Sequence, residues 1–91
     1  MYKQRMTDKV IEMVTNYTLD VLEENKYKEF SVYVVWHCYI LGNQKWLLAT
    51  TLPDDMYYEV IYNNVKDEFY FDAYKKIDNY CYSNTTQNDR I

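Results

Sequence analysis

The chain has very little glycine or proline: Gly42 and Pro53 are the single examples among 91 residues. Without glycine-rich or proline-rich stretches it offers no flexible linker and no low-complexity segment. One glycine also argues against a glycine-rich loop that cradles phosphate groups. We therefore expect one domain over residues 1–83, followed by a frayed tail at residues 84–91 that has little apolar surface to bury.

Long apolar runs and metal-binding side chains are also scarce. No stretch approaches the roughly 20 apolar residues that span a bilayer, and the N-terminus lacks a signal-peptide pattern, so we expect a cytoplasmic protein with no membrane partner. Cys38 and Cys81 are then expected as reduced thiols. His37, the single histidine, would point to the opposite strand face from Cys38, which disfavours a Cys–His catalytic pair. We predict no catalytic residue, no metal site, no cofactor and no enzymatic activity.

Acidic residues outnumber basic ones by 14 to 10. The whole excess lies in residues 52–91, because residues 1–51 hold six of each sign. A nucleic-acid-binding surface needs the opposite sign, so we expect no direct contact with nucleic acid. Most charge runs are solvated edges. The sharper interpretation is an acidic patch that docks on a basic protein surface, formed by Asp54, Asp55, Asp67 and Glu68.

An apolar stripe at helical spacing predicts a long helix near the N-terminus. The stripe consists of Val10, Val14, Tyr17 and Val21, with a mixed polar face opposite. Thr7 is a candidate N-cap, and Asp8 follows in the first turn, where the helix dipole favours a carboxylate. We predict a helix from about Thr7 to Asn25 that packs on the core.

Four later segments rich in β-branched and aromatic residues predict strands: Phe30–Leu41, KWLLATTL at 45–52, Met56–Tyr62 and Glu68–Tyr74. Gly42-Asn43 signals the first turn. A two-residue loop there pairs Trp36 with Ala49, and a three-residue loop pairs Trp36 with Thr50. Both registers stay open, because both faces of this hairpin are apolar.

In the second hairpin, a two-residue loop would set Glu59 opposite Glu68, and facing like charges destabilise a strand pair. We therefore predict a four-residue loop, 63–66, which pairs Val60 with Phe69. Residues 73–82 read either as a short helix or as continued strand. The predicted fold is α+β: one N-terminal helix on a four-stranded antiparallel meander sheet, in a cystatin-like arrangement.

A single helix covers one face of such a sheet and leaves the other face open. An open face this apolar exceeds what monomers normally expose, so it predicts a surface for a homodimer, a protein partner or a ligand. The candidate binding residues are Tyr33, Val35, His37, Tyr39, Tyr57, Glu59, Tyr70, Asp72 and Tyr74, with Ile61 on the same face.

Several motifs carry a resemblance to known proteins: VYVVW at 32–36, WLLATT at 46–51, DMYYEVIYN at 55–63 and FDAYKK at 71–76. With them, residues 30–81 resemble a family of small proteins of phages and prophages of Gram-positive bacteria that has no established activity. The second hairpin is also similar to the closing hairpin of PepSY domains, although Lys75-Lys76-Ile77 stand where that family usually turns at a glycine.

The phage resemblance implies a small soluble factor that alters the host by stoichiometric binding. We therefore expect an inhibitor of a host protein, such as an anti-CRISPR-like protein acting on a nucleic-acid-binding defence or replication protein. One alternative is a protein that sequesters a nucleotide or another small molecule, since aromatic faces stack on bases. The other is a homodimeric structural or assembly factor.

Overall fold

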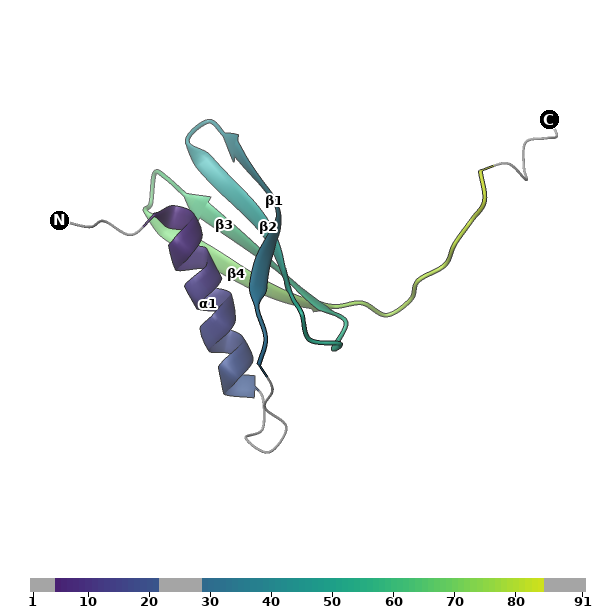
Figure 1. Cartoon of the computed structure of the whole chain (residues 1–91). Coiled ribbons are helices and arrows are strands. Elements are labelled where there is room, and N and C mark those ends of the chain that lie inside the picture. Colours follow the sequence, from purple (N-terminus) through teal and green to yellow (C-terminus); the bar gives the residue numbers. More distant parts are fainter. Residues whose placement is uncertain (1–4, 22–28, 85–91) are drawn as a thin grey trace.

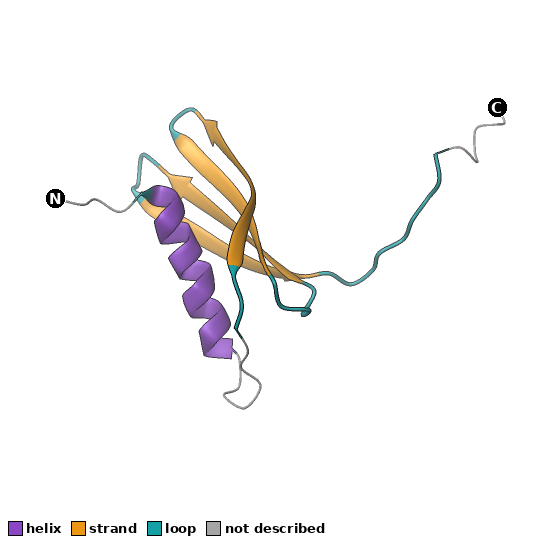
Figure 2. Cartoon of the chain, in the orientation of Figure 1, coloured by secondary structure: helices purple, strands orange, loops and turns teal. Residues whose placement is uncertain are grey.

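One helix and four strands make up the fold of the computed structural model, which describes residues 5–21 and 29–84. They are α1 (Met6–Val21), β1 (Val32–Ile40), β2 (Asn43–Thr50), β3 (Met56–Asn63) and β4 (Glu68–Lys75). The strands form one antiparallel sheet in the order β1-β2-β3-β4, and α1 lies across one face of it (Figure 1). Figure 2 shows the described residues as two layers, the helix and the sheet. The predicted α+β meander is confirmed.

Helix α1 begins one residue earlier than predicted. The Lys9 amide donates a hydrogen bond of 3.1 Å to the Arg5 carbonyl, so Thr7 lies inside the first turn and is not the N-cap. Its hydroxyl instead accepts a 3.0 Å hydrogen bond from the indole Nε1 of Trp46 in β2. Thr7 therefore satisfies a polar group of the core and not a helix end. The predicted helical residues 22–25 lie outside the described residues.

The core lies between α1 and the inner face of β2 and β3. Trp46, Leu48, Tyr58 and Val60 are almost fully buried there, against Val10, Val14 and Thr18 of α1. Thr18, not Val21, continues the buried stripe, since Val21 is 58% exposed. The Thr18 hydroxyl donates to the Val14 carbonyl at 2.8 Å, which satisfies this polar group inside the core.

The first hairpin turns at Leu41-Gly42, one residue before the predicted turn. Ile40 pairs with Asn43, and both turn residues have positive φ, 50° and 87°. Two consecutive positive φ angles match the right-handed twist of the flanking strands. Trp36 consequently pairs with Leu47. Both registers that the sequence left open are wrong, because leucine takes the first left-handed position and glycine the second.

A bulge in β1 reverses its side-chain alternation. Val34 pairs with Leu48 and Trp36 with Leu47, so Val35 is an extra residue without its own partner on β2. Before the bulge, Val32 and Val34 face α1. After it, His37 and Tyr39 face α1, while Trp36, Cys38 and Ile40 take the opposite face. The prediction that His37 and Tyr39 lie on the open face is wrong for this reason.

The second hairpin has the predicted loop length in a shifted place. Asn63 pairs with Glu68, so the four-residue loop is 64–67 and not 63–66. Val60 pairs with Phe71, not with Phe69. This shift of two residues leaves every β4 side chain on its predicted face, because strand alternation has a period of two.

Beyond β4 the chain leaves the sheet. The Lys76 amide donates to the Asp55 carbonyl at 2.8 Å. Residues 77–84, here named the C-terminal arm, then run away from the sheet (Figure 1) and form neither the helix nor the strand that the sequence suggested. Strand pairing within the sheet thus ends at Lys75. Of the predicted tail, residues 85–91 lie outside the described residues.

Leu41 is 96% exposed at φ 50°, a left-handed conformation that costs side chains with a Cβ about 1–2 kcal/mol. We expect Leu41→Gly to raise the free energy of unfolding by about 0.5–1 kcal/mol, after the entropy cost of glycine, in urea denaturation. The matched variant Gly42→Ala should lower it, since its Cβ would lie 3.3 Å from Asn64 Nδ2 at φ 87°. An unchanged or lower stability of Leu41→Gly would contradict this description of the turn.

Thr7→Val is expected to lower the free energy of unfolding by about 1 kcal/mol, because the buried indole N–H of Trp46 loses its acceptor. Thr7→Ser keeps the hydroxyl and should lose much less. Urea denaturation followed by tryptophan fluorescence measures both. Equal losses in the two variants would show that the hydroxyl of Thr7 contributes nothing to stability.

Candidate functional site

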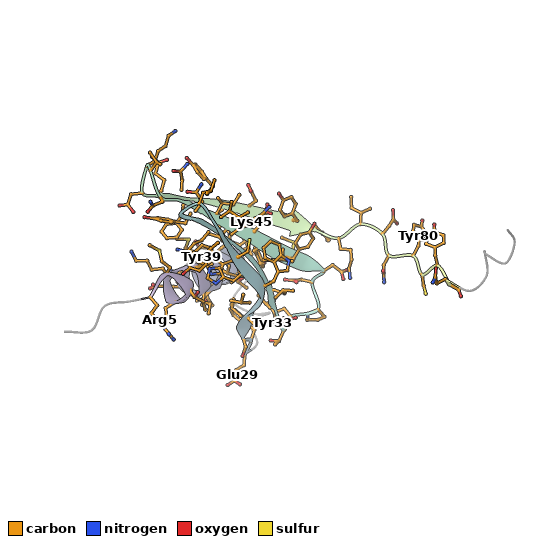
Figure 3. The ribbon with its side chains drawn as sticks, turned by 90° about the horizontal axis from the view of Figure 1, so that it is seen from above. Arg5, Glu29, Tyr33, Tyr39, Lys45 and Tyr80 are labelled. Atoms are coloured by element: carbon orange, nitrogen blue, oxygen red, sulfur yellow. The ribbon has the colours of Figure 1, made fainter. Side chains whose placement is uncertain are left out.

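The face of the sheet turned away from α1, named here the outer face, is the candidate site. Alternate residues of all four strands supply it (Figure 3, where Lys45 and Tyr33 are labelled). They are Tyr33, Trp36, Cys38 and Ile40 from β1, Lys45, Leu47 and Ala49 from β2, Tyr57, Glu59 and Ile61 from β3, and Tyr70, Asp72 and Tyr74 from β4. The alternation that predicts His37 and Tyr39 on the open face would put Trp36, Cys38 and Ile40 on the other face. Because β1 is apolar on both sides, its alternation carries no signal of the bulge.

Aromatic rings dominate the outer face, and they are half exposed. Tyr33, Trp36, Tyr57, Tyr70 and Tyr74 each expose between 38% and 49% of their surface. A half-exposed tyrosine covers apolar surface with its ring while its hydroxyl still reaches water or a partner. Contiguous exposed aromatic surface is typical of protein interaction sites, where tyrosine and tryptophan are enriched.

A charged group sits at the centre of these rings. Lys45 Nζ lies 2.8 Å from Glu59 Oε2, and the Tyr74 hydroxyl donates to Glu59 Oε1 at 3.3 Å. Asp72 is directly opposite Glu59 in the β3–β4 register, where the predicted register would have placed Tyr70. Lys45 offsets the repulsion of this acidic pair, and its bond to Glu59 in turn raises the pKa of Lys45.

The tyrosines around this group are held in place. The rings of Tyr57 and Tyr74 stack with centroids 5.0 Å apart, and the Tyr70 hydroxyl donates to Glu68 at 2.8 Å. Partial burial, followed by the nearby carboxylates of Asp72 and Glu59, raises the pKa of Tyr74, while the bond to Glu68 raises that of Tyr70. Both phenols therefore stay neutral and can donate hydrogen bonds at physiological pH.

His37 belongs to the rim of the core and not to the outer face. Its ring stacks on Trp46 with centroids 4.7 Å apart, and its Nε2 donates to Gln44 Oε1 at 2.8 Å. Tyr39 lies beside it, 69% exposed on the α1 side (labelled in Figure 3). Val35, at the bulge, is exposed but outside the regular alternation. The other predicted binding residues share the outer face.

The four acidic residues predicted as one patch are separated. Asp54 and Asp55 precede β3 and Asp67 and Glu68 follow it, so the whole strand lies between the two pairs. Each pair has a local role: Asp54 Oδ1 accepts the Met56 amide at 3.1 Å, and Asp67 Oδ1 accepts the Tyr62 hydroxyl at 2.6 Å. A single acidic patch is therefore wrong, since the sheet places the pairs at opposite ends.

A small hollow opens where the outer face meets the first hairpin. It has a volume of about 220 Å³ and is lined by Cys38, Ile40, Asn43, Gln44, Lys45 and Ile61. Small-molecule sites usually occupy about 300–1,000 Å³ and enclose their ligand. The size and the largely apolar walls therefore suit one inserted side chain of a partner better than a whole cofactor.

Residues suited to metal or membrane binding do not gather in the described ranges. Across 5–21 and 29–84, no three His, Cys, Asp or Glu side chains lie close enough together to hold a metal ion. Within the same ranges, no helix has the length and apolar character needed to cross a bilayer. Cys38 and Cys81 are both free thiols, the first half-buried and the second exposed.

Fold and surface together define a small α+β protein in which a helix covers one sheet face and tyrosines line the other. The chain belongs to a family of unknown function, DUF6275, whose family model matches residues 3–84. No curated protein and no solved structure matches it. The family match includes α1, the whole sheet and the C-terminal arm.

The raised pKa values of the tyrosines predict how stability depends on pH. Burial raises the pKa of Tyr58 above its ordinary value of 10.0, in the same direction as Tyr70 and Tyr74. The folded chain then holds these protons more tightly than the unfolded chain, so this stability is present below pH 10 and lost as pH rises through the raised values. The urea concentration at the unfolding midpoint should therefore fall as pH rises above 10. The fall should be less steep for Tyr58→Phe, because this variant lacks the phenol proton of Tyr58. Midpoints that stay level would contradict the raised values.

Proposed function

We propose that the protein is a non-enzymatic binding protein that attaches to another protein through its outer face and acts by forming a stoichiometric complex. The observation that supports this most is the set of half-exposed rings around the Lys45–Glu59 pair. Rigid aromatic side chains beside satisfied charges resemble the anchors that contribute most of the affinity in protein interfaces. The hollow at Ile40 and Ile61 offers a pocket for one anchor from the partner.

A protein target fits this surface better than a nucleotide. Phosphate recognition needs uncompensated positive charge, and Glu59 neutralises Lys45 at 2.8 Å. The neighbouring Asp72 adds a second negative charge at the same place. Stacked rings favour a base, but the acidic centre of the outer face opposes its phosphates.

The resemblance to phage and prophage proteins of Gram-positive bacteria suggests the kind of target. We infer that the partner is a cytoplasmic host protein, and that covering its surface inhibits a defence or replication step. A central hydrogen-bonding carboxylate, Glu59, would confer specificity for a donor on that partner, and the surrounding rings would supply the buried apolar area.

The proposal predicts that outer-face tyrosines control capture of the target. Immobilised wild-type chain should retain a specific protein from a Gram-positive host lysate, and Tyr57→Ser/Tyr70→Ser should weaken the purified complex at least about 30-fold by calorimetry, the loss of one strong anchor. Tyr39→Ser is the matched control, because Tyr39 is an exposed tyrosine on the α1 side. It should bind like wild type.

Two results would overturn the proposal. One is equal affinity of the outer-face variant and wild type for the target, which would show that the target contacts another surface. The other is a complex with no fixed stoichiometry, which would indicate adhesion of exposed rings. Circular dichroism of all variants establishes that the sheet persists, since these side chains lie outside the core.

A further inference from the structure

The C-terminal arm exposes apolar side chains that no other described residue covers. Ile77, Tyr80 and Tyr82 are 88%, 72% and 86% exposed, although the family match extends through residue 84. Apart from the Tyr80–Tyr82 ring contact, no interaction of these three with the rest of the described chain is present. An extended segment of eight residues with two aromatic rings has the composition and length of a strand without a neighbour.

One side of β4 has no neighbouring strand among the described residues, so the arm of another chain could pair there. The two edge strands are β1 and β4. The bulge at Val35 interrupts β1, and such bulges protect edges from pairing with other chains. Strand β4 pairs with β3 without interruption over its eight residues and contains no proline, so its free edge can accept another strand.

Backbone geometry restricts how that edge can pair. The Lys76 amide bonds to the Asp55 carbonyl, so the even-numbered residues of β4 direct their amides and carbonyls toward β3. The odd-numbered residues, from Phe69 to Lys75, direct theirs to the free edge. An added antiparallel strand must therefore pair its own edge-directed residues with these.

We propose that two copies of the chain join through this edge: the arm of each copy pairs antiparallel with β4 of the other, about a two-fold axis at Ile77. A continuous strand over residues 70–84 then meets its own copy. The contact is isologous, as expected of a closed dimer. It uses the arm and the β4 edge only, so it stands apart from the proposed function.

Charge pairing favours a two-fold axis at Ile77 over an axis at Lys75 or Lys76. An axis at Lys75 would set Asp72 against Asp78 of the second copy, and an axis at Lys76 would set the two Lys76 side chains against each other. The axis at Ile77 sets Lys76 opposite Asp78 twice and packs Ile77 on Ile77. Opposite charges across a strand pair stabilise it, and like charges destabilise it.

The same register enlarges the outer face. Directly opposed residues of antiparallel strands share a face. Tyr80 of the second copy would lie next to Tyr74, and Tyr82 next to Asp72. Two four-stranded sheets thus become one layer, with both outer faces on one side and both α1 helices on the other. The arm's exposed rings then lie against side chains of the second copy.

Analytical ultracentrifugation of the full chain tests the proposal. Wild type should be a dimer, a chain ending at Lys76 should be a monomer with an unchanged circular dichroism spectrum, and a chain ending at Asn84 should stay dimeric. A monomeric wild type overturns the proposal. So does a chain ending at Lys76 that dimerises as wild type does, because that dimer would use another surface, such as the outer face.

Charge reversal tests the register. Lys76→Asp and Asp78→Lys should each weaken the homodimer about tenfold or more, because each places like charges opposite one another twice. Mixing the two variants should restore a heterodimer of wild-type affinity, since every opposed pair is again complementary. Failure of the mixture to associate overturns the axis at Ile77. Loss of target binding by outer-face variants leaves these results unaffected, so the two proposals fail separately.

Discussion

The extra residue at Val35 determines which of the β1 side chains that follow it face α1 and which lie on the outer face. It turns Trp36 to the outer face and brings His37 over Trp46, where the two rings stack 4.7 Å apart. Gln44 and Thr7 then satisfy the polar atoms at this end of the core. Without the bulge, Trp36 would compete with α1 for space and the outer face would lose its largest ring.

The helix and four strands could be predicted from the sequence because their patterns agree with their environments. Faces in β3 and β4 followed from the two-residue alternation, in which one face carries the carboxylates Glu59, Glu68 and Asp72 and the other face carries none. Tyr70 and Tyr74 were therefore also placed correctly despite a shifted loop. In β1 both faces are apolar, and a one-residue bulge leaves no trace in such a pattern. The left-handed conformation of Leu41 could not be predicted either, because leucine rarely adopts it.

The two faces of the sheet have different environments. The inner face and α1 bury a narrow core centred on Trp46, Leu48 and Tyr58. Rings on the outer face are positioned by stacking and hydrogen bonds but stay half exposed, with Glu59 at their centre. This arrangement supports the proposed binding function, in which the strands are a rigid support for the rings.

Fluorescence quenching by acrylamide tests the placement of the two tryptophans most directly. Trp46 is fully buried, and Trp36 is 42% exposed on the outer face. We expect two emitting populations in the wild-type chain, one protected and one accessible, and we expect Trp36→Phe to remove only the accessible one. Emission from Trp36→Phe that remains as easily quenched as the accessible wild-type fraction would contradict the bulge and the outer face built on it.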